Sequence, residues 1–135
     1  MVADDNKQMR EKVVQLLQPH LDVVGSAADG KAALDMIMLL KPDLMILDIS
    51  MPILCGLDVA VELAKQGSPV RVIFLTVHED PDFLKAALEA GASGYVVKSH
   101  MVTDLMAAVK SASQGSIYVS PSCTFPSGTS VPDMA

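Results

Sequence analysis

Short apolar runs alternate five times with segments of helical periodicity, and this alternation limits the fold more than any other feature. The runs are continuous rather than alternately polar, as in Leu44–Leu47 and Val72–Leu75. Strands of this kind are typical of a parallel sheet that helices bury on both faces. The sequence therefore predicts the α/β class, with a doubly wound sheet of five parallel strands.

Capping residues mark where the helices begin and end. Asn6 is suited to cap the first helix, and Asp80 followed by Pro81 is suited to begin the fourth. Glycines just after a periodic segment are typical of helix ends. We expect helices between Asn6 and Pro19, from Asp29 to Leu40, from Leu57 to Gly67, from Pro81 to Gly91 and from about Leu105 to Gly115, with the second strand over Leu21 to Ala27.

Polar side chains stand just past four of the apolar runs: Asp4 with Asp5, Asp48, Thr76 and Lys98. In an open parallel sheet, ligands bind outside the carboxyl ends of the strands. Adjacent acids resist ionising together unless a cation lies between them, and Mg²⁺ binds through one or two carboxylates. Asp4 and Asp5 alone are more simply explained as solvated loop acids or a helix cap. An acid directly after an interior strand, as Asp48 is, needs a partner, so the sequence predicts a site for Mg²⁺ and a phosphoryl group.

Each polar residue has a role in that chemistry and an ordinary alternative. The Asp48 carboxylate is placed to act as a nucleophile on phosphorus, which gives an aspartyl phosphate. Thr76 and Lys98 together offer a hydroxyl and a cation to phosphoryl oxygens. Alone, the first is most often satisfied by the backbone and the second most often lies along the surface. We expect Tyr95 to be a half-buried filler. Three histidines show no metal-ligand spacing and are expected at the surface: His20, His78 and His100.

Length, charge and cysteine content narrow the class of protein. The 135 residues fit one domain, and the net charge of −6 argues against nucleic-acid binding by this chain. Cys55 and Cys123 lie far apart, which is typical of free thiols in a reducing compartment. No apolar run reaches the ~18 residues of a membrane span. We expect a cytoplasmic protein, with a folded domain over residues 1–118 and a Pro- and Ser-rich linker or flexible tail over 119–135.

The polar motifs also carry a family resemblance. Asp4-Asp5, Asp48 with the following Ile49-Ser50-Met51-Pro52, Thr76 and Tyr95-Val96-Val97-Lys98 resemble the receiver domain of two-component response regulators. The resemblance covers roughly residues 1 to 118. The stretches Ala90–Tyr95 and Gln114–Pro121 are most similar to the subfamily that carries a C-terminal helix-turn-helix of the LuxR type.

The resemblance implies a fold and a set of site residues. The fold would be flavodoxin-like, (β/α)5, with strand order 2-1-3-4-5. Asp48 would accept the phosphoryl group, and Asp5, Asp48 and the Ser50 carbonyl would hold Mg²⁺ directly, with Asp4 reaching it through water. Thr76 and Lys98 would bind the phosphoryl oxygens, and Tyr95 would turn inward as Thr76 moves. Ser50, Val77 and His78 would modulate access to the site.

The resemblance also implies partners. A sensor histidine kinase would supply the phosphoryl group, and the signal would pass to a DNA-binding domain that this chain lacks. The chain would be no enzyme beyond its own phosphorylation and dephosphorylation, and we expect a weak homodimer. A stand-alone receiver or phosphorelay adaptor is the alternative.

Two other classes of protein fit less well. A haloacid-dehalogenase-type phosphatase typically carries a second acid two residues after its nucleophile, and Ser50 stands there. A binding-only pseudo-receiver tends to lose the acids or the lysine that are present here.

The chain departs from the family pattern in other places. Ser99 follows Lys98 where proline is usual, and Val77 is bulkier than the residue that is usual there. Only three residues precede Asp4, so the first strand is expected to be truncated.

Overall fold

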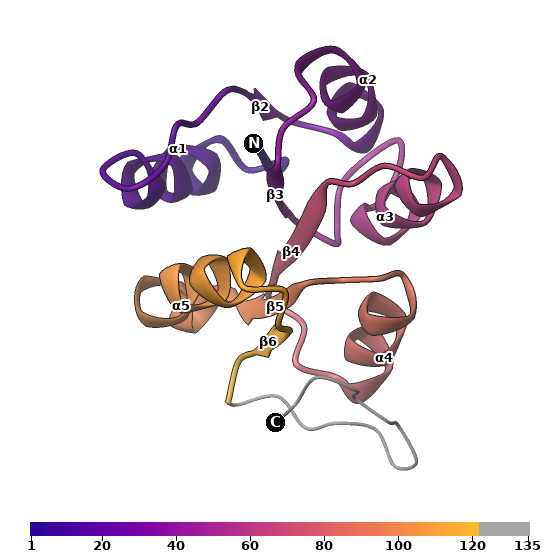
Figure 1. The fold of residues 1–135 in the computed structure, drawn as a ribbon. Helices are drawn as coiled ribbons and strands as arrows, with labels where there is room; N and C mark the ends of the chain where they lie inside the picture. The colour runs from indigo at the N-terminus through magenta and orange to yellow at the C-terminus, as the bar shows by residue number, and fades with distance from the viewer. Residues whose placement is uncertain (122–135) are drawn as a thin grey trace.

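Six parallel strands form the centre of the fold, in the order β2-β1-β3-β4-β5-β6 (Figure 1). The structure is a computed structural model and describes residues 1–121. The strands are β1 (Val2–Ala3), β2 (Ser26–Ala27), β3 (Leu44–Leu47), β4 (Arg71–Thr76), β5 (Gly94–Val97) and β6 (Tyr118–Val119).

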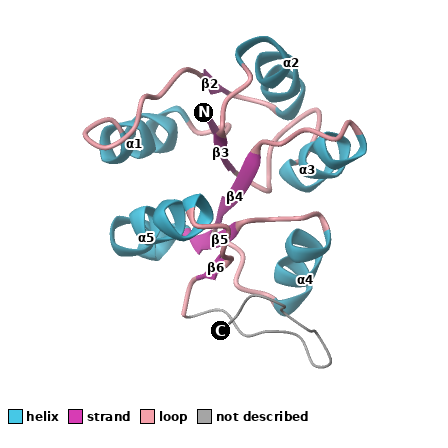
Figure 2. Ribbon diagram, in the orientation of Figure 1, coloured by secondary structure: helices cyan, strands magenta, loops and turns pink. Residues whose placement is uncertain are grey.

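Helices cover both faces of the sheet, as Figures 1 and 2 show. The helices are α1 (Lys7–Leu17), α2 (Gly30–Leu40), α3 (Gly56–Lys65), α4 (Pro81–Glu89) and α5 (Met101–Ser113), with a short 3-10 helix, η1 (Lys98–His100), before α5. Helices α1 and α5 lie on one face, and α2, α3 and α4 lie on the other. Within residues 1–121, no helix is both long and apolar enough to span a membrane.

The strands separate the interior into two apolar clusters, because successive side chains of a strand point to opposite faces. Met45 and Phe74 pack on the side of α2, α3 and α4, whereas Ile46 and Ile73 pack on the side of α1 and α5. The continuous apolar runs are thus explained by burial on both faces. The predicted α/β class and the doubly wound parallel sheet are confirmed.

The predicted number of strands is wrong, because β6 adds a sixth strand beside β5. The order of the first five strands is the predicted 2-1-3-4-5. Two residues are too few for a recognisable strand pattern, and β6 forms because the chain returns along the open edge of β5. The expected domain boundary after residue 118 falls within β6, and Ser120 beyond it is buried. Most of the predicted tail, residues 122–135, lies outside the described residues.

The second strand is shorter than predicted. A strand was expected over Leu21–Ala27, but only Ser26 and Ala27 pair with β1. Leu21 and Val23 pack against the core cluster of α1 and α5 without joining the sheet. Their apolar character reflects burial beside an edge strand rather than strand pairing.

The predicted cap of the first helix is present, and the structure adds a cap at the second helix that was not predicted. The Asn6 side chain accepts a hydrogen bond from Met9 N at 3.0 Å, and Asp29 accepts one from Ala32 N at 2.8 Å. Asp80 precedes α4 without a side-chain capping bond, and Pro81 occupies the first turn as predicted. These caps begin each helix just past a strand end, so the loops between them gather at one edge of the sheet.

Candidate functional site

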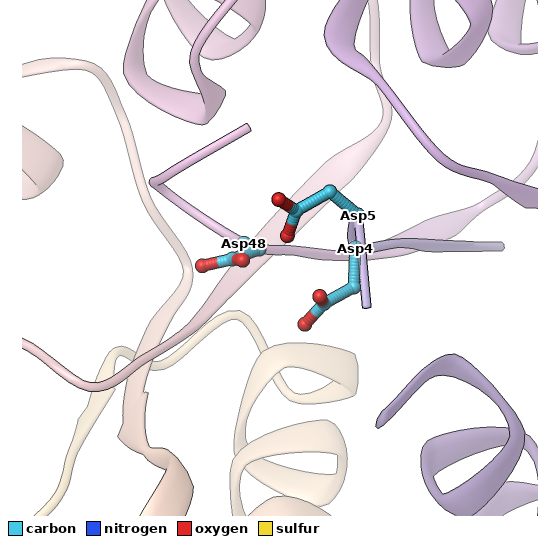
Figure 3. A group of neighbouring side chains, drawn as sticks. All are labelled: Asp4, Asp5 and Asp48. Atoms are coloured by element: carbon cyan, nitrogen blue, oxygen red, sulfur yellow. The ribbon is translucent and has the colours of Figure 1, made fainter. Parts of the chain in front are cut away.

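Three carboxylates meet at the carboxyl edge of the sheet, where β1 and β3 end. One oxygen from each of Asp4, Asp5 and Asp48 lies within 4.8 Å of the others. Figure 3 shows the three side chains gathered at this edge, although Asp48 is far from the other two in sequence. Asp4 and Asp48 are buried, at 2% and 5% exposed, whereas Asp5 is exposed. The predicted acid cluster is therefore present.

Lys98 extends from the end of β5 into this cluster. Its Nζ lies 2.8 Å from Asp4 Oδ2 and 3.2 Å from Asp48 Oδ2, and its side chain is 14% exposed. Burial acts to lower the pKa of the ammonium, but the hydrogen bond to Asp4 and the charges of Asp48 and Asp4 raise it overall. Lys98 is thus held as a cation between two buried acids.

Both carboxylate oxygens of Asp48 have partners. Its Oδ1 accepts a hydrogen bond of 3.3 Å from Ser50 N, and its Oδ2 pairs with Lys98. Burial raises the pKa of the carboxyl group and the charge of Asp4 raises it further, while Lys98 and the Ser50 hydrogen bond lower it. The net direction is upward, so the site favours any further positive charge that stabilises the carboxylate.

Asp4 is held through its Oδ1 and its main chain, and Lys98 alone contacts its other carboxylate oxygen among the described residues. Its Oδ1 accepts from Asn6 N at 2.9 Å, and Arg10 Nη1 donates to its main-chain carbonyl at 2.8 Å. Its Oδ2 is buried and has no partner among the described residues beyond the ion pair with Lys98. Three carboxylates facing one ammonium leave an excess of negative charge. The donor set therefore fits a hard divalent cation such as Mg²⁺, which takes oxygen ligands.

Two glycines let the chain hold Asp48 in place. A Cβ on Gly56, at the start of α3, would collide with the carbonyl oxygen of Asp48, and Gly56 N donates to Ile49 O at 2.7 Å. A Cβ on Gly30, at the start of α2, would collide with the carbonyl oxygen of Leu54. The loop from Asp48 to Gly56 is therefore packed against two helix ends that only glycine can bring so close.

Thr76 ends β4 next to the acid cluster. It is completely buried, and its Oγ1 accepts a hydrogen bond from His78 N at 3.1 Å. Within the sheet it lies opposite Val97, the residue that precedes Lys98. The structure thus places the predicted hydroxyl and the predicted ammonium on neighbouring strand ends.

His78 joins the loops at the mouth of the site. Its Nε2 lies 2.9 Å from Ser50 Oγ, and its ring stacks on Phe83 with a centroid distance of 4.0 Å. The expectation of a surface residue is wrong for His78, which is half-buried by these contacts, whereas His20 and His100 are exposed as predicted. Val77 beside it is 66% exposed. Modulation of access by these three loop residues stays a prediction.

Tyr95 is fully buried, so the expectation of a half-buried filler is wrong. Its phenol donates a hydrogen bond of 2.7 Å to the main-chain carbonyl of His78. The side chain points into the cluster beside α4 because Tyr95 and Phe74 occupy paired positions of β5 and β4. Tyr95 thus points inward in this structure, and the turn that would accompany a movement of Thr76 stays a prediction.

Sequence reasoning missed several contacts around the site. Arg10 showed no signal of its own, because a basic residue in the first helix is usually solvated. Phe83 was one apolar residue of a periodic helix, and its stacking on His78 depends on the loop conformation. Asp104, which is buried in the structure, stands next to Leu105 and Met106 in the sequence, and an acid beside the apolar positions of a helix is a signal that could have been followed.

A second hollow lies at the opposite edge of the sheet and contains none of the predicted site residues. Its volume is about 660 Å³, and it lies at the amino ends of β3 and β4. The lining includes Ile37, Leu63 and Pro69 with Lys41 and Arg71 at the rim. No acid cluster or buried cation accompanies it among the described residues, so we place the chemistry at the acid cluster.

Comparisons with known proteins agree with the geometry. A model of the response regulator receiver domain matches residues 1–110. The chain is 37% identical to the transcriptional regulatory protein YvfU of Bacillus subtilis, over 92% of this chain and 63% of YvfU. It is 36% identical to the transcriptional regulatory protein NarL of Mycobacterium tuberculosis, over 90% of this chain and 57% of NarL. The chain thus spans less than two thirds of either relative.

Solved structures show the same likeness. The signal receiver domain of NarL from Mycobacterium tuberculosis superposes with a TM-score of 0.80 at 36% identity, covering 84% of this chain and 94% of that one. A LuxR-family two-component response regulator from Aurantimonas sp. SI85-9A1 gives 0.85 at 30% identity, covering 90% and 88%. RcsB, solved as dimers bound to DNA, gives 0.83 at 25% identity, covering 90% and 62%. Fold, site and sequence therefore agree that the chain belongs to the receiver domains of two-component response regulators, and its relatives lie in the LuxR and NarL branch.

Proposed function

We propose that the chain is a phosphorylation-controlled switch whose phosphoacceptor is Asp48. The observation that carries the proposal is the buried Asp48 carboxylate, which lies within reach of Lys98 and two further acids. A buried nucleophile beside a cation and a metal-binding acid cluster is suited to phosphoryl transfer, because positioning and charge neutralisation supply most of the catalysis in that reaction.

The proposed transfer needs one bond to form and one to break. An Asp48 carboxylate oxygen attacks phosphorus, and the bond from phosphorus to the imidazole nitrogen of a histidine kinase breaks, so that the nitrogen leaves with its electron pair. Lys98, freed from Asp48 Oδ2 as that acid loses charge, turns to the phosphoryl oxygens. The hydroxyl of Thr76 donates to them from the neighbouring strand end.

We assign Mg²⁺ to Asp5, Asp48 and the main-chain carbonyl of Ser50, with Asp4 reaching it through water. The ion would supply neutralisation of the charge that gathers between acids and phosphoryl group. The burial of Asp4 and its Oδ2, which Lys98 alone contacts among the described residues, support this assignment. Exposed Asp5 supports an ion that enters from solvent and keeps several waters.

Loss of the phosphoryl group would be a second transfer, in which a water oxygen attacks phosphorus, the bond from phosphorus to the Asp48 oxygen breaks, and Asp48 leaves as a carboxylate with release of inorganic phosphate. The Ser50 and His78 side chains, joined across the mouth at 2.9 Å, support a role in limiting the approach of that water. Val77 is exposed beside them, and its side chain would restrict the entry of water from solvent. The chain would thus promote its own phosphorylation and dephosphorylation without turning over another substrate.

Thr76 and Tyr95 form the proposed switch. Thr76 Oγ1 and Tyr95 OH both contact main-chain atoms of His78, so a movement of Thr76 toward the phosphoryl group would act on the same loop that holds Tyr95. A shift of a two-state balance from 1:99 to 99:1 takes about 5.5 kcal/mol. Charge-assisted hydrogen bonds to a phosphoryl group are of a strength that supplies a large part of it.

We propose a DNA-binding output in the whole protein, outside this chain, because the relatives are transcriptional regulators of greater length. The linker to it would begin after Ser120. The net charge of −6 supports the absence of specific DNA binding by residues 1–135 alone. The alternative is a stand-alone receiver or phosphorelay adaptor. A cytoplasmic location, where histidine kinases would meet their receivers, belongs to the same proposal.

A weak homodimer that phosphorylation strengthens is the proposed form of the output from this chain. The contact would use the face of α4, β5 and α5 or the face of α1 and α5. Sedimentation velocity with and without beryllofluoride tests this proposal. A shift toward dimer on addition of beryllofluoride is expected, and an unchanged monomer at all concentrations would contradict it.

Binding of beryllofluoride, which mimics a phosphoryl group, tests the proposed site. Fluorine NMR of the protein with beryllofluoride and Mg²⁺ should show bound resonances, and these should disappear in Asp48→Asn and in excess chelator. Asp43→Asn, which changes an exposed acid before β3, is the matched control and should bind as wild type does. Bound resonances that persist in Asp48→Asn would contradict the assignment.

A further inference from the structure

A carboxylate that the proposed chemistry does not use is buried in α5. Asp104 is 9% exposed and is the one acid among the buried residues of this helix. Buried acids need partners, and no cation pairs with this one among residues 1–121. Its partners are hydroxyl groups, all of which donate to it: Tyr118 OH at 3.0 Å and Thr103 Oγ1 at 3.3 Å to Oδ1, and Ser120 Oγ at 3.0 Å to Oδ2.

Ser120 connects Asp104 to β5 through hydrogen bonds. It is 1% exposed, its main-chain N donates to Tyr95 O at 2.9 Å, and its Oγ accepts from Val97 N at 3.0 Å. In a continuing parallel strand, a main-chain carbonyl would take that N–H group. Here a side-chain hydroxyl replaces it, so the sheet bonding extends to Val97 although β6 ends at Val119.

Asp104 fixes the direction of the Ser120 hydroxyl. An ionised carboxylate can only accept, so the Ser120 O–H group points to Asp104 and its lone pairs remain for Val97 N–H. Without Asp104, the hydroxyl could rotate and compete for other acceptors. The two residues therefore act as one unit on the last amide of β5.

That amide lies directly before Lys98. Val97 is held on one side by pairing with β4 at Thr76 and on the other side by Ser120. The chain then turns into η1 at Lys98, whose Nζ reaches Asp4 and Asp48. The position of Val97 thus sets where the Lys98 side chain begins.

We propose that Asp104 and Ser120 are positioning residues for Lys98, acting through the Val97 amide. In this role they set the geometry of the ammonium in the acid cluster. The proposal rests on the proposed function only in that Lys98 is taken to bind phosphoryl oxygens.

Ser120→Ala removes the acceptor of the Val97 amide and is the first test. Amide exchange at Val97, followed by NMR without phosphate or metal, should accelerate about tenfold, and the Lys98 Nζ and Cε resonances should shift. Ser113→Ala is the matched control, because Ser113 is an exposed residue at the end of α5 whose hydroxyl donates to Lys110 O. It should leave both readouts unchanged.

Beryllofluoride affinity with saturating Mg²⁺ is the second readout. Ser120→Ala should weaken it by about three- to tenfold, the range of one lost hydrogen bond, whereas Ser113→Ala should not. Asp104→Asn keeps the shape of the side chain and covers the case in which Ser120→Ala does not fold. It should shift the Lys98 resonances in the same direction, because an amide no longer accepts from every hydroxyl around it.

Faster exchange at Val97 with unchanged Lys98 resonances and unchanged beryllofluoride affinity would overturn the proposal and leave a purely structural contact. Failure of wild-type protein to bind beryllofluoride would instead count against the proposed function. The Lys98 resonances of the metal-free variants would still decide the positioning role in that case.

Discussion

The Tyr95 phenol donates a hydrogen bond of 2.7 Å to the main-chain carbonyl of His78, the residue whose N–H group bonds Thr76. One loop residue therefore contacts the end of β4 and a buried side chain of β5. Because both bonds use main-chain atoms of His78, they hold the loop whatever its side chain does. A movement of Thr76 at the site would therefore act through this loop on the face of β5 and α4.

Tyr95→Phe removes that hydrogen bond and keeps the ring. We expect a loss of about 0.5–1.5 kcal/mol in the free energy of unfolding, measured by urea titration, because one hydrogen bond is lost in a buried site. Beryllofluoride binding should remain, while the NMR shifts that it causes in α4 and β5 should shrink. Full-size shifts in Tyr95→Phe would show that the phenol takes no part in the switch.

Lys98→Ala removes the cation that two buried acids share. The rate of phosphorylation by acetyl phosphate should fall about 100-fold, which is typical for loss of one group that stabilises transition-state charge. Intact-protein mass spectrometry over time measures the rate. Lys85→Ala, at an exposed lysine of α4, is the control. A rate for Lys98→Ala within twofold of the control would exclude the proposed role of the ammonium.

His78→Ala removes the side chain that bridges to Ser50 across the mouth of the site. Hydrolysis of the phosphorylated protein should become roughly fivefold faster, since one hydrogen bond of about 1 kcal/mol no longer holds the loops together. Ser50→Ala removes the other side chain of the same bridge, so it should also speed hydrolysis. It keeps the main-chain carbonyl that is proposed to bind Mg²⁺. His20→Ala, an exposed histidine, controls for the loss of an imidazole. Equal half-lives of the phosphorylated forms of all variants would show that the bridge does not limit the access of water to the site.

Gly56→Ala introduces a Cβ that collides with the carbonyl oxygen of Asp48. The free energy of unfolding should fall by about 1–3 kcal/mol, and beryllofluoride binding should weaken because the loop that carries Asp48 must move. In Gly91→Ala, a Cβ meets nothing within 4 Å, but φ is +88°, so backbone strain alone should lower stability. That control should keep wild-type beryllofluoride affinity. The same loss of affinity in both variants would mean that stability rather than Asp48 geometry is responsible.

The sequence allowed the core of the fold and the acid cluster to be predicted because both depend on local patterns. Leu44–Leu47 is apolar on both faces, and Asp48 follows at once, so strand, burial and site come from five consecutive residues. The predicted helix cap Asn6 is equally local.

Features that depend on distant contacts could not be predicted in this way. β6 is only two residues long and exists because β5 offers a free edge. The half-burial of His78 follows from how its loop meets Phe83 and Ser50, and the full burial of Tyr95 depends on its position opposite Phe74 in the sheet. The contacts of Asp104 with Tyr118 and Ser120 likewise join residues that share no local pattern.

The central claim is that Asp48 accepts the phosphoryl group in a reaction that requires Mg²⁺. Incubation with acetyl phosphate and Mg²⁺, followed by reduction of the acyl phosphate with borohydride and peptide mapping by mass spectrometry, tests it most directly. We predict a single modified residue, Asp48, with no modification in excess chelator or in Asp48→Asn. Modification at another residue, or at Asp48 without a divalent cation, would contradict the account.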